Sequence, residues 1–348
     1  MTRGAKVSVT MRDVARAAGV SHMTVSRALR NDGTVAPATR DRILTLVREM
    51  NYVPNQMAGS LTTRRSGFVA MLIPSLNNLH FAETVQALTD ELEGIGRQVL
   101  LGYTAYDRAR EEQLVESMLR RRPEAIVLSH DGHSPRTVAL LREAQVPVIE
   151  LWETPVNPIG HTVGFSNHDA ARHMTERLIE QGYRKLVFLG EADDDWTRGA
   201  ARRRGFAAAM AAAGLDPDRC IKYGRPPLSI EDGAAALPDL LSRYADADCV
   251  FCVSDAAAFG LISALRDSGR RVPQDIAVAG FGDFEVSRFA VTPISTVSVD
   301  PHAIGTATGS LVATLLAEES PGDAAAQHLA IEVTVTLRAS TENPKIKR

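Results

Sequence analysis

The chain has 348 residues, of which 45% are hydrophobic and 23% are charged, and its formal net charge is -3. This length suits a small module joined to a larger two-lobed domain, and the composition excludes disordered and fibrous proteins. No apolar run approaches the ~20 residues of a membrane helix, and the N-terminus lacks the apolar stretch of a signal peptide. We therefore expect a cytoplasmic protein with no membrane partner.

Positive charge is concentrated at the start of the chain. Residues 1–65 carry eleven arginine and lysine side chains against four acidic ones, so the acidic surplus lies in the remaining residues. A basic module on an acidic body is typical of a protein that contacts phosphate groups with one end only.

The first 54 residues predict a module of three helices. Thr10 can cap a first helix with Asp13 as its capping-box partner, and Gly19 can end that helix. Ser21 can cap a second helix, and a third is expected from Pro37 to about residue 50. Two short helices joined by a glycine-containing turn predict a helix-turn-helix.

In a helix-turn-helix, the start of the second helix lies in the DNA major groove. His22 and Met23 occupy the positions of the first base contacts, and Arg27 can donate two hydrogen bonds to a guanine. Thr24 and Ser26 suit phosphate oxygens. The alternative is that His22 and Met23 are merely exposed residues of a small helical bundle.

From Ser66 onward, apolar strands alternate with amphipathic helices, which predicts parallel sheets covered on both faces. Strands are expected at residues 68–73, 98–103, 125–129, 147–151, 162–165, 185–189, 221–223, 249–253 and 276–281. Helices are expected near residues 81–94, 110–121, 136–144, 170–181, 202–213, 231–242 and 256–267. We place one lobe at 66–163 with 293–322, a second lobe at 164–292 with 323–340, and a tail at 341–348.

Several motifs closely resemble the DNA-binding headpiece of the lactose-repressor (LacI/GalR) family. They are the run Val9-Thr-Met-Arg-Asp-Val-Ala, the run Ala18-Gly-Val-Ser-His-Met-Thr-Val-Ser-Arg27, Val35, Thr39-Arg40, and Asn51-Tyr-Val-Pro-Asn55 with Leu61. The α/β remainder resembles the effector-binding core of that family, which is similar to periplasmic sugar-binding proteins. The resemblance covers essentially the whole chain.

The resemblance implies a role for residues 55–65, which on their own predict only a poor helix. Residues 56–61 resemble the family's hinge helix, which forms on the operator, with Leu61 as the apolar wedge that enters the minor groove. Gly59 and Ser60 depart from a strong helix. Alternatively, Leu61 packs on the core. The predicted DNA-binding residues are Thr10, Ser21, His22, Met23, Thr24, Ser26, Arg27, Asn55 and Leu61.

Ligands of open α/β sheets bind at the carboxyl ends of the strands. The predicted effector-binding residues there are Asn77, Phe81, Tyr103, His130, Glu150, Trp152, Asn167, Arg198, Arg202, Ser254 and Asp283. By resemblance, Arg202 matches the family's effector-anchoring arginine and Asp283 an acidic residue that accepts hydrogen bonds from ligand hydroxyls. Alternatively, Arg202 is a solvated helix start and Asp283 caps the next helix.

Catalytic and metal-binding patterns receive little support from the sequence. Cys249 and Cys252 have metal-site spacing, but on a strand residues i and i+3 point to opposite faces, so we expect a structural role. His130, Asp131 and His133 lack a further ligand. Without a nucleophile elbow or phosphate loop, we expect no enzyme activity, no metal and no cofactor.

Four segments resemble the gluconate-operon repressors of the family in particular. They are Pro74-Ser-Leu-Asn-Asn78 with Phe81-Ala-Glu83, Ser134-Pro-Arg-Thr137, Val148-Ile-Glu-Leu151, and Val163-Gly-Phe165 with Ala170-Ala-Arg172. We therefore predict a repressor of double-stranded operator DNA that responds to gluconate or a related sugar acid. Neutral or phosphorylated sugars remain alternatives, as does a sugar-binding receptor. The short polar tail lacks the heptads of a tetramer, so a homodimer is expected.

Overall fold

The computed structural model describes residues 9–30, 32–53, 66–129, 132–192, 197–318, 322 and 324–342. The chain divides into two compact units, one ending at Ser66 and one beginning at Gly67. Within the described ranges, no helix is long and apolar enough to cross a membrane.

The first unit contains three helices, α1 (Met11–Ala18), α2 (His22–Leu29) and α3 (Pro37–Glu49). Thr10 and Asp13 form the predicted capping box, and the Ser21 hydroxyl accepts a hydrogen bond from the Thr24 amide at 3.1 Å. Gly19 ends α1 with a φ of 62°, a left-handed conformation that glycine adopts without strain. These local contacts confirm the predicted helix-turn-helix. Its small core comprises Val14, Ala15, Ala18, Val25, Ala28, Val35 and Ile43.

The second unit contains two six-stranded sheets. The first has the order β11-β5-β4-β3-β1-β2, and the second has the order β12-β10-β9-β8-β6-β7. The first sheet comprises β1 (Phe68–Ile73), β2 (Gln98–Tyr103), β3 (Ile126–Ser129), β4 (Val148–Leu151), β5 (His161–Gly164) and β11 (His328–Ala330). The second comprises β6 (Leu186–Glu191), β7 (Cys220–Tyr223), β8 (Cys249–Cys252), β9 (Ala277–Gly282), β10 (Ser295–Ser298) and β12 (Thr334–Thr336).

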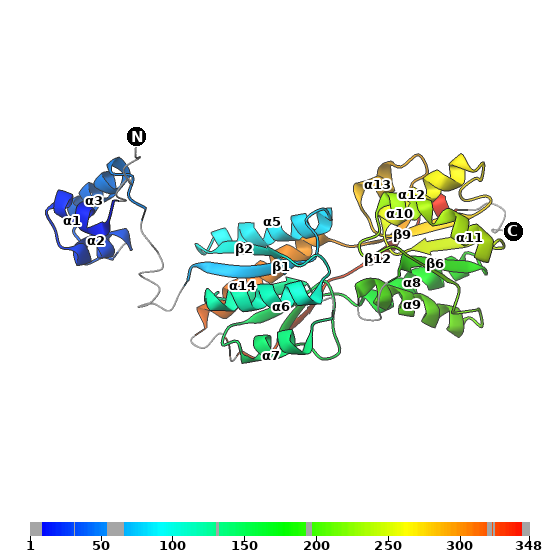
Figure 1. Cartoon of the computed structure of the whole chain (residues 1–348), viewed down its shortest axis with the longest axis horizontal. Helices are drawn as coiled ribbons and strands as arrows, with labels where there is room; N and C mark the ends of the chain where they lie inside the picture. The colour runs from blue at the N-terminus through cyan, green and yellow to red at the C-terminus, as the bar shows by residue number, and fades with distance from the viewer. Residues whose placement is uncertain are drawn as a thin grey trace, which may run out of the picture. The chain divides into compact units, whose positions relative to one another are not determined.

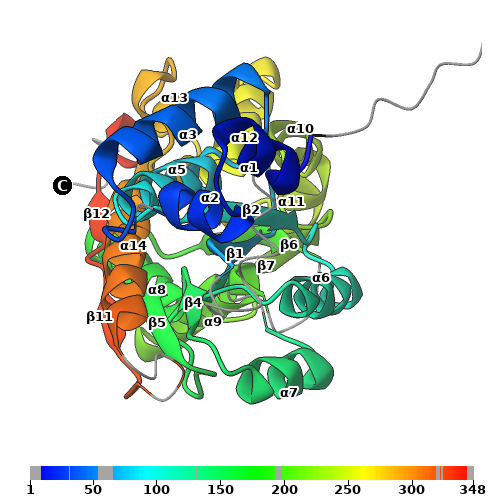
Figure 2. The same ribbon diagram turned by 90° about the vertical axis from the view of Figure 1, so that its left-hand side faces the viewer.

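Helices cover both faces of the first sheet, as the buried strand pattern requires. Val69, Met71 and Ile73 of β1 join one apolar cluster, whereas Ala70 and Leu72 join another, because successive side chains of a strand point to opposite faces. Figure 2 shows α14 beside α5 on one side and α6 and α7 on the other. These helices are α5 (Leu79–Glu93), α6 (Arg108–Arg120), α7 (Pro135–Glu143) and α14 (Pro301–Ala317).

The second sheet is also covered on both faces. Helix α8 packs on α9, and α10 packs on α12, with the two pairs on opposite faces (Figure 1). The helices of this lobe are α8 (Asn167–Glu180), α9 (Arg198–Ala212), α10 (Ile230–Ala235), α11 (Leu237–Arg243), α12 (Asp255–Asp267) and α13 (Glu285–Phe289). A short 3₁₀ helix, η2, spans Ala339–Thr341.

Two strands lie in a different sheet from the one that the predicted lobe boundaries assign to them. Strand β10 pairs with β9 of the second sheet, although residues 293–322 were assigned to the first lobe. Strand β11 pairs with β5 of the first sheet, although residues 323–340 were assigned to the second. Strand β10 lies between β9 and β12 in the second sheet. Strand β11 is an edge strand of the first sheet and pairs with residues far earlier in the chain, and a pairing of that kind leaves no local pattern.

The structure also corrects the helix predicted near residues 231–242. It is two helices, α10 and α11, and Pro238 lies in the first turn of α11. Proline lacks an amide hydrogen and clashes with the preceding turn, so it tolerates the start of a helix but not its interior. The last strand that the sequence predicts ends at residue 281. The sequence therefore did not predict the later elements, which include β10, α14, β11 and β12.

Candidate functional site

Two surfaces carry the residues that the sequence selected, and the first is the start of α2. His22, Met23 and Arg27 are exposed there, whereas Val25 and Ala28 of the same helix are buried in the core of the first unit. The Arg27 guanidinium lies 4.0 Å from the Asp32 carboxylate, and its side chain is 51% exposed. A long cation held this loosely remains available to an external hydrogen-bond acceptor.

The other predicted DNA-binding residues differ in their exposure, and two of them cannot be placed. Thr10 and Ser21 are exposed and form caps, while Thr24 and Ser26 are partly buried on α2. Asn55 and Leu61 lie outside the described residues.

The second surface is a pocket between the two lobes of the larger unit, which we call the inner pocket. It is lined by Phe81 and Trp152 of the first lobe and by Arg198, Arg202 and Ser254 of the second, all five predicted from the sequence. Its volume is about 70 Å³. At the 10–15 Å³ that one water position requires, this is room for roughly five to seven waters.

Arg202 is the most firmly held cation of the inner pocket. Its Nε donates to Asn167 Oδ1 at 2.9 Å, its Nη1 donates to the Val253 carbonyl at 2.7 Å, and its guanidinium lies 3.6 Å from the centroid of the Phe281 ring. Burial, and then the charge of Arg198, lower the pKa of Arg202 to about 10, so it stays protonated at neutral pH. Asn167 therefore positions the arginine and does not line the pocket itself.

Arg198 lies one helical turn before Arg202 on α9, on the same face of the helix. Its guanidinium donates to the hydroxyl of Ser129 at the end of β3 and lies 5.1 Å from the centroid of Phe81. This arginine therefore bridges the two lobes. Two guanidinium groups at one end of a pocket suit an anionic ligand.

Aromatic rings also line the inner pocket. Phe81 contacts Trp152 edge to face at 5.5 Å, and Trp152 contacts Phe165 in the same manner at 6.3 Å. The imidazole of His80 stacks on Phe284. Burial lowers the pKa of His80 to about 4, helped by the charge of Arg202, so this ring is neutral at neutral pH.

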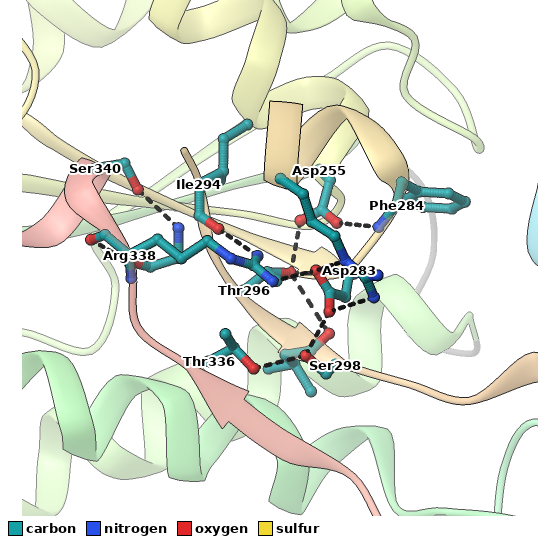
Figure 3. A network of polar contacts seen from close by, with 12 residues as sticks. Asp255, Asp283, Phe284, Ile294, Thr296, Ser298, Thr336, Arg338 and Ser340 are labelled. Atoms are coloured by element: carbon teal, nitrogen blue, oxygen red, sulfur yellow. Dashed lines mark hydrogen bonds and ion pairs between the residues drawn. The ribbon is translucent and has the colours of Figure 1, made fainter. Parts of the chain in front are cut away.

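Asp283 lies outside the inner pocket and lines a neighbouring cavity. Its carboxylate accepts hydrogen bonds from Arg338 Nη2 at 2.7 Å, Ser298 Oγ at 2.9 Å and Arg288 Nη2 at 3.1 Å, as Figure 3 shows in part. Burial raises its pKa, but Arg288 and Arg338 outweigh that effect and hold the pKa below its usual value. Nor does Asp283 cap α13, whose N-cap residue Phe284 lacks a side-chain cap bond.

The Asp283 network joins segments that are far apart in the chain. Ser298 of β10 shares a hydrogen bond of 2.7 Å with Thr336 of β12, and Arg338 Nη1 donates to the Ile294 carbonyl (Figure 3). The neighbouring Asp255 accepts from Thr296 Oγ1 at 2.6 Å and from the Phe284 amide at 2.9 Å. These aspartates hold the second lobe together next to the pocket, whereas Gly282, one residue earlier, lines the pocket.

Three further predicted residues lie elsewhere. Tyr103 stacks against the Arg110 guanidinium at 4.6 Å, and Tyr106 lines the pocket instead. Asn77 is exposed, and its neighbour Asn78 lines the pocket. Glu150 is fully buried among first-lobe residues. His130 lies outside the described residues.

Glu150 belongs to a buried cluster with His133 and Glu111. The His133 Nδ1 atom lies 2.8 Å from Glu111 Oε1, its Nε2 atom lies 3.5 Å from Glu150 Oε1, and the Glu150 carboxylate also accepts the Ile159 amide. Burial lowers the pKa of His133, but hydrogen bonds to the two carboxylates and their charges outweigh this and raise it to about 9. This histidine is therefore a structural cation.

The His133 cluster makes stability depend on pH. Protonated His133 stabilises the folded state, and this stabilisation is fully present below pH 6.5, the ordinary pKa of histidine. It is lost as the pH rises through about 9, where His133 loses its proton in the folded state. Since one pKa unit is worth about 1.4 kcal/mol, we expect about 3 kcal/mol of unfolding free energy to disappear over that window. Urea titrations from pH 6 to 10 measure it. His133→Gln should abolish this pH dependence, and an unchanged slope in that variant would contradict the assignment.

The sequence analysis missed several lining residues, among them His80, Tyr106, Glu191, Thr197, Phe281 and Phe284. Phe281 ends a predicted strand, so its position at the carboxyl edge could have indicated it. Tyr106 and Phe284 follow their strands at a distance set by loop geometry. Cys249 and Cys252 are buried in β8, as expected, and the described residues contain no cluster of His, Cys, Asp and Glu side chains that could hold a metal.

Known proteins share both units. The family model of bacterial regulatory proteins, lacI family, matches residues 10–55, and that of the periplasmic binding protein-like domain matches residues 175–341. The HTH-type transcriptional regulator IdnR of Escherichia coli (strain K12) is 35% identical, over 85% of this chain and 89% of its own length.

Solved structures agree with this result. A LacI family transcriptional regulator from Silicibacter pomeroyi is 60% identical with a TM-score of 0.76, covering 80% of this chain and 100% of that one. The lac repressor dimer bound to operator and the anti-inducer ONPF is 23% identical with a TM-score of 0.82, over 96% of this chain and 99% of that one, and shows the same fold. The chain therefore belongs to the LacI family and is a DNA-binding transcriptional regulator.

Proposed function

We propose that this regulator is a homodimeric repressor whose affinity for its operator is controlled by a sugar acid bound in the inner pocket. Each headpiece contacts half of a near-palindromic operator through α2. The fold neighbour that is a dimer on its operator supports this arrangement. Because its partner is operator DNA, we place the protein in the cytoplasm.

We infer an anionic effector from the way in which Arg202 is held. Asn167, the Val253 carbonyl and the Phe281 ring fix its guanidinium, so its orientation is set before a ligand arrives. Arg198 adds a second guanidinium on the same helix face. Preorganised guanidinium groups bind carboxylates with charge-assisted hydrogen bonds, and little rotamer entropy remains to be lost.

The rest of the inner pocket suits a hydroxylated chain. Glu191, Ser254 and Tyr106 offer hydrogen-bond acceptors and hydroxyl groups, while Trp152 and Phe81 offer apolar faces for carbon atoms. Such a mixture of aromatic walls and a few polar groups is typical of small-molecule sites. Together with the resemblance to gluconate-operon repressors, this favours gluconate or a related sugar acid.

Effector binding must be coupled to DNA binding in both directions. The pocket is formed by both lobes, so a ligand that fits one closure state better shifts the lobes toward that state. Residues 56–61, proposed as the hinge helix, would transmit this shift to the headpiece. By linkage, operator DNA must then change effector affinity by the same factor that the effector changes operator affinity.

A gel-shift titration of the full chain on its upstream DNA tests the proposal. Gluconate should change operator affinity at concentrations at which glucose and 6-phosphogluconate do not, because only gluconate supplies one carboxylate to the arginines without a second anionic group. A response to glucose alone would favour the neutral-sugar alternative. No response to any of the three would reject the proposed effector class, and no DNA shift at all would show that the upstream DNA is not the operator.

A further inference from the structure

A second cavity, which we call the outer cavity, lies next to the inner pocket. Its volume is about 490 Å³, against about 70 Å³ for the inner pocket. His80, Phe284 and Val299 line both spaces. These three residues therefore lie at the boundary between the two cavities, which we call the wall.

The main part of this wall is a ring stack built from both lobes. His80 lies in the first turn of α5, and Phe284 follows β9 of the second lobe. Their ring centroids are 3.9 Å apart with an interplanar angle of 13°, and Trp152 lies 5.7 Å from the His80 centroid at the same angle. Rings stacked this closely leave no room between them for a sugar unit.

The backbone holds both rings in place. Asn78 Oδ1 accepts the His80 amide at 3.1 Å, and Asp255 accepts the Phe284 amide at 2.9 Å. Gly282 leaves the room that the stack requires, because a Cβ atom there would lie 2.8 Å from Phe284 Cε2 and 3.1 Å from His80 Cε1. Its φ of 130° is also one that other residues rarely adopt.

The outer cavity has a chemistry of its own. Its polar lining consists of the carboxylates of Glu83, Asp283, Glu285, Asp300 and Glu332, one guanidinium, Arg288, which lies 3.1 Å from Asp283, and the hydroxyls of Ser298 and Thr334. Carboxylates accept hydrogen bonds from sugar hydroxyls, so this lining suits a neutral, hydroxyl-rich group. The same carboxylates repel a second anionic group.

We propose that the His80–Phe284 stack sets the length of the effector, limiting it to one sugar-acid unit in the inner pocket. Without the stack, the two cavities merge and admit a two-unit acid whose neutral sugar occupies the outer cavity. The inference rests on the proposed function for the position of the carboxylate. The length limit itself depends only on the wall.

Calorimetric titration of the full-length protein tests this limit. The ligands are gluconate and lactobionate, which is gluconate carrying one galactose, and the variants are His80→Ala and Phe284→Ala. Wild type should bind lactobionate at least roughly tenfold more weakly than gluconate, since pockets discriminate by 10-fold or more even against one surplus methylene. Each variant should reduce or abolish this preference for gluconate over lactobionate. The control His173→Ala removes an exposed histidine of α8 that lines neither cavity and should keep the wild-type ratio.

Further ligands and variants distinguish the ways in which the proposal could be wrong. 6-Phosphogluconate should gain nothing in the variants, because its second anionic group would face the carboxylates of the outer cavity. Equal binding of both acids by wild type would overturn the length limit, as would folded variants that keep gluconate binding without gaining lactobionate. If wild type binds glucose and not gluconate, the effector class is wrong, and glucose against lactose then tests the limit. Should Phe284→Ala not fold, Phe284→Leu provides the measurement. Failure of every one-unit ligand to bind wild type would overturn both proposals.

Discussion

Replacing Arg202 by alanine should nearly abolish the response to the effector. The substitution removes a guanidinium that is partly buried, protonated and fixed by Asn167 and Val253. Truncating one member of a buried, hydrogen-bonded charge pair costs about 2–5 kcal/mol, so gluconate affinity should fall roughly 30-fold or more. Calorimetry of the full chain measures the affinity, and a gel-shift with gluconate measures the response.

Two further variants show whether this loss is specific to the site. Arg202→Lys keeps the positive charge but lacks the planar guanidinium that donates hydrogen bonds to both Asn167 and the Val253 carbonyl. This variant should therefore recover only part of the gluconate affinity. Arg204→Ala removes an exposed cation from the same helix, one that does not line the pocket, and should bind as wild type does. Equal losses in Arg202→Ala and Arg204→Ala would mean that general electrostatics, and not an anchored carboxylate, explains the binding.

Replacing Arg27 by alanine should weaken operator binding by about 1–3 kcal/mol and relax the preference at one base pair of each half-site. Arg27 lies on the exposed face of α2, with Asp32 at 4.0 Å as a weak competitor for its charge. Losing a bidentate contact to guanine removes affinity for that base alone. Binding to a panel of operators, each with a single substituted base pair, measures the effect.

Arg12 provides the matched comparison, because it is exposed on α1, and the first helix of a helix-turn-helix crosses the DNA backbone, so we expect it to contact phosphate. Arg12→Ala should weaken binding to all sequences alike and lower the slope of affinity against salt by about 1. If both variants lowered the affinity for every operator by the same factor, the assignment of Arg27 to a base contact would be wrong.

The structure agrees with the sequence wherever the interactions are local. The caps at Thr10 and Ser21 and the turn at Gly19 depend on residues three or four positions apart, so the helix-turn-helix could be predicted from its own segment. The alternation of apolar runs with amphipathic helices likewise predicted most strands of both sheets. Of the residues selected by their position relative to strand ends, Phe81, Trp152, Arg198, Arg202 and Ser254 line the pocket.

The structure places two of the predicted residues outside the inner pocket. Asp283 directly follows β9 and is held by Arg338, whereas Glu150 lies within β4 against His133. The backbone of Asp283 is left-handed, with a φ of 63°, and Gly282, one residue earlier, lines the pocket. Neither arrangement can be read from the local sequence.

The sequence by itself determined the family, the helix-turn-helix and the two-lobed class, since these follow from local periodicity and a specific motif. The tertiary structure decided which polar groups line the inner pocket and which ones hold the lobes together. It also brought His80 of α5 against Phe284 after β9, about two hundred residues apart in the chain. Contacts of this kind depend on how two separate lobes close on each other, and no segment of the sequence contains both partners.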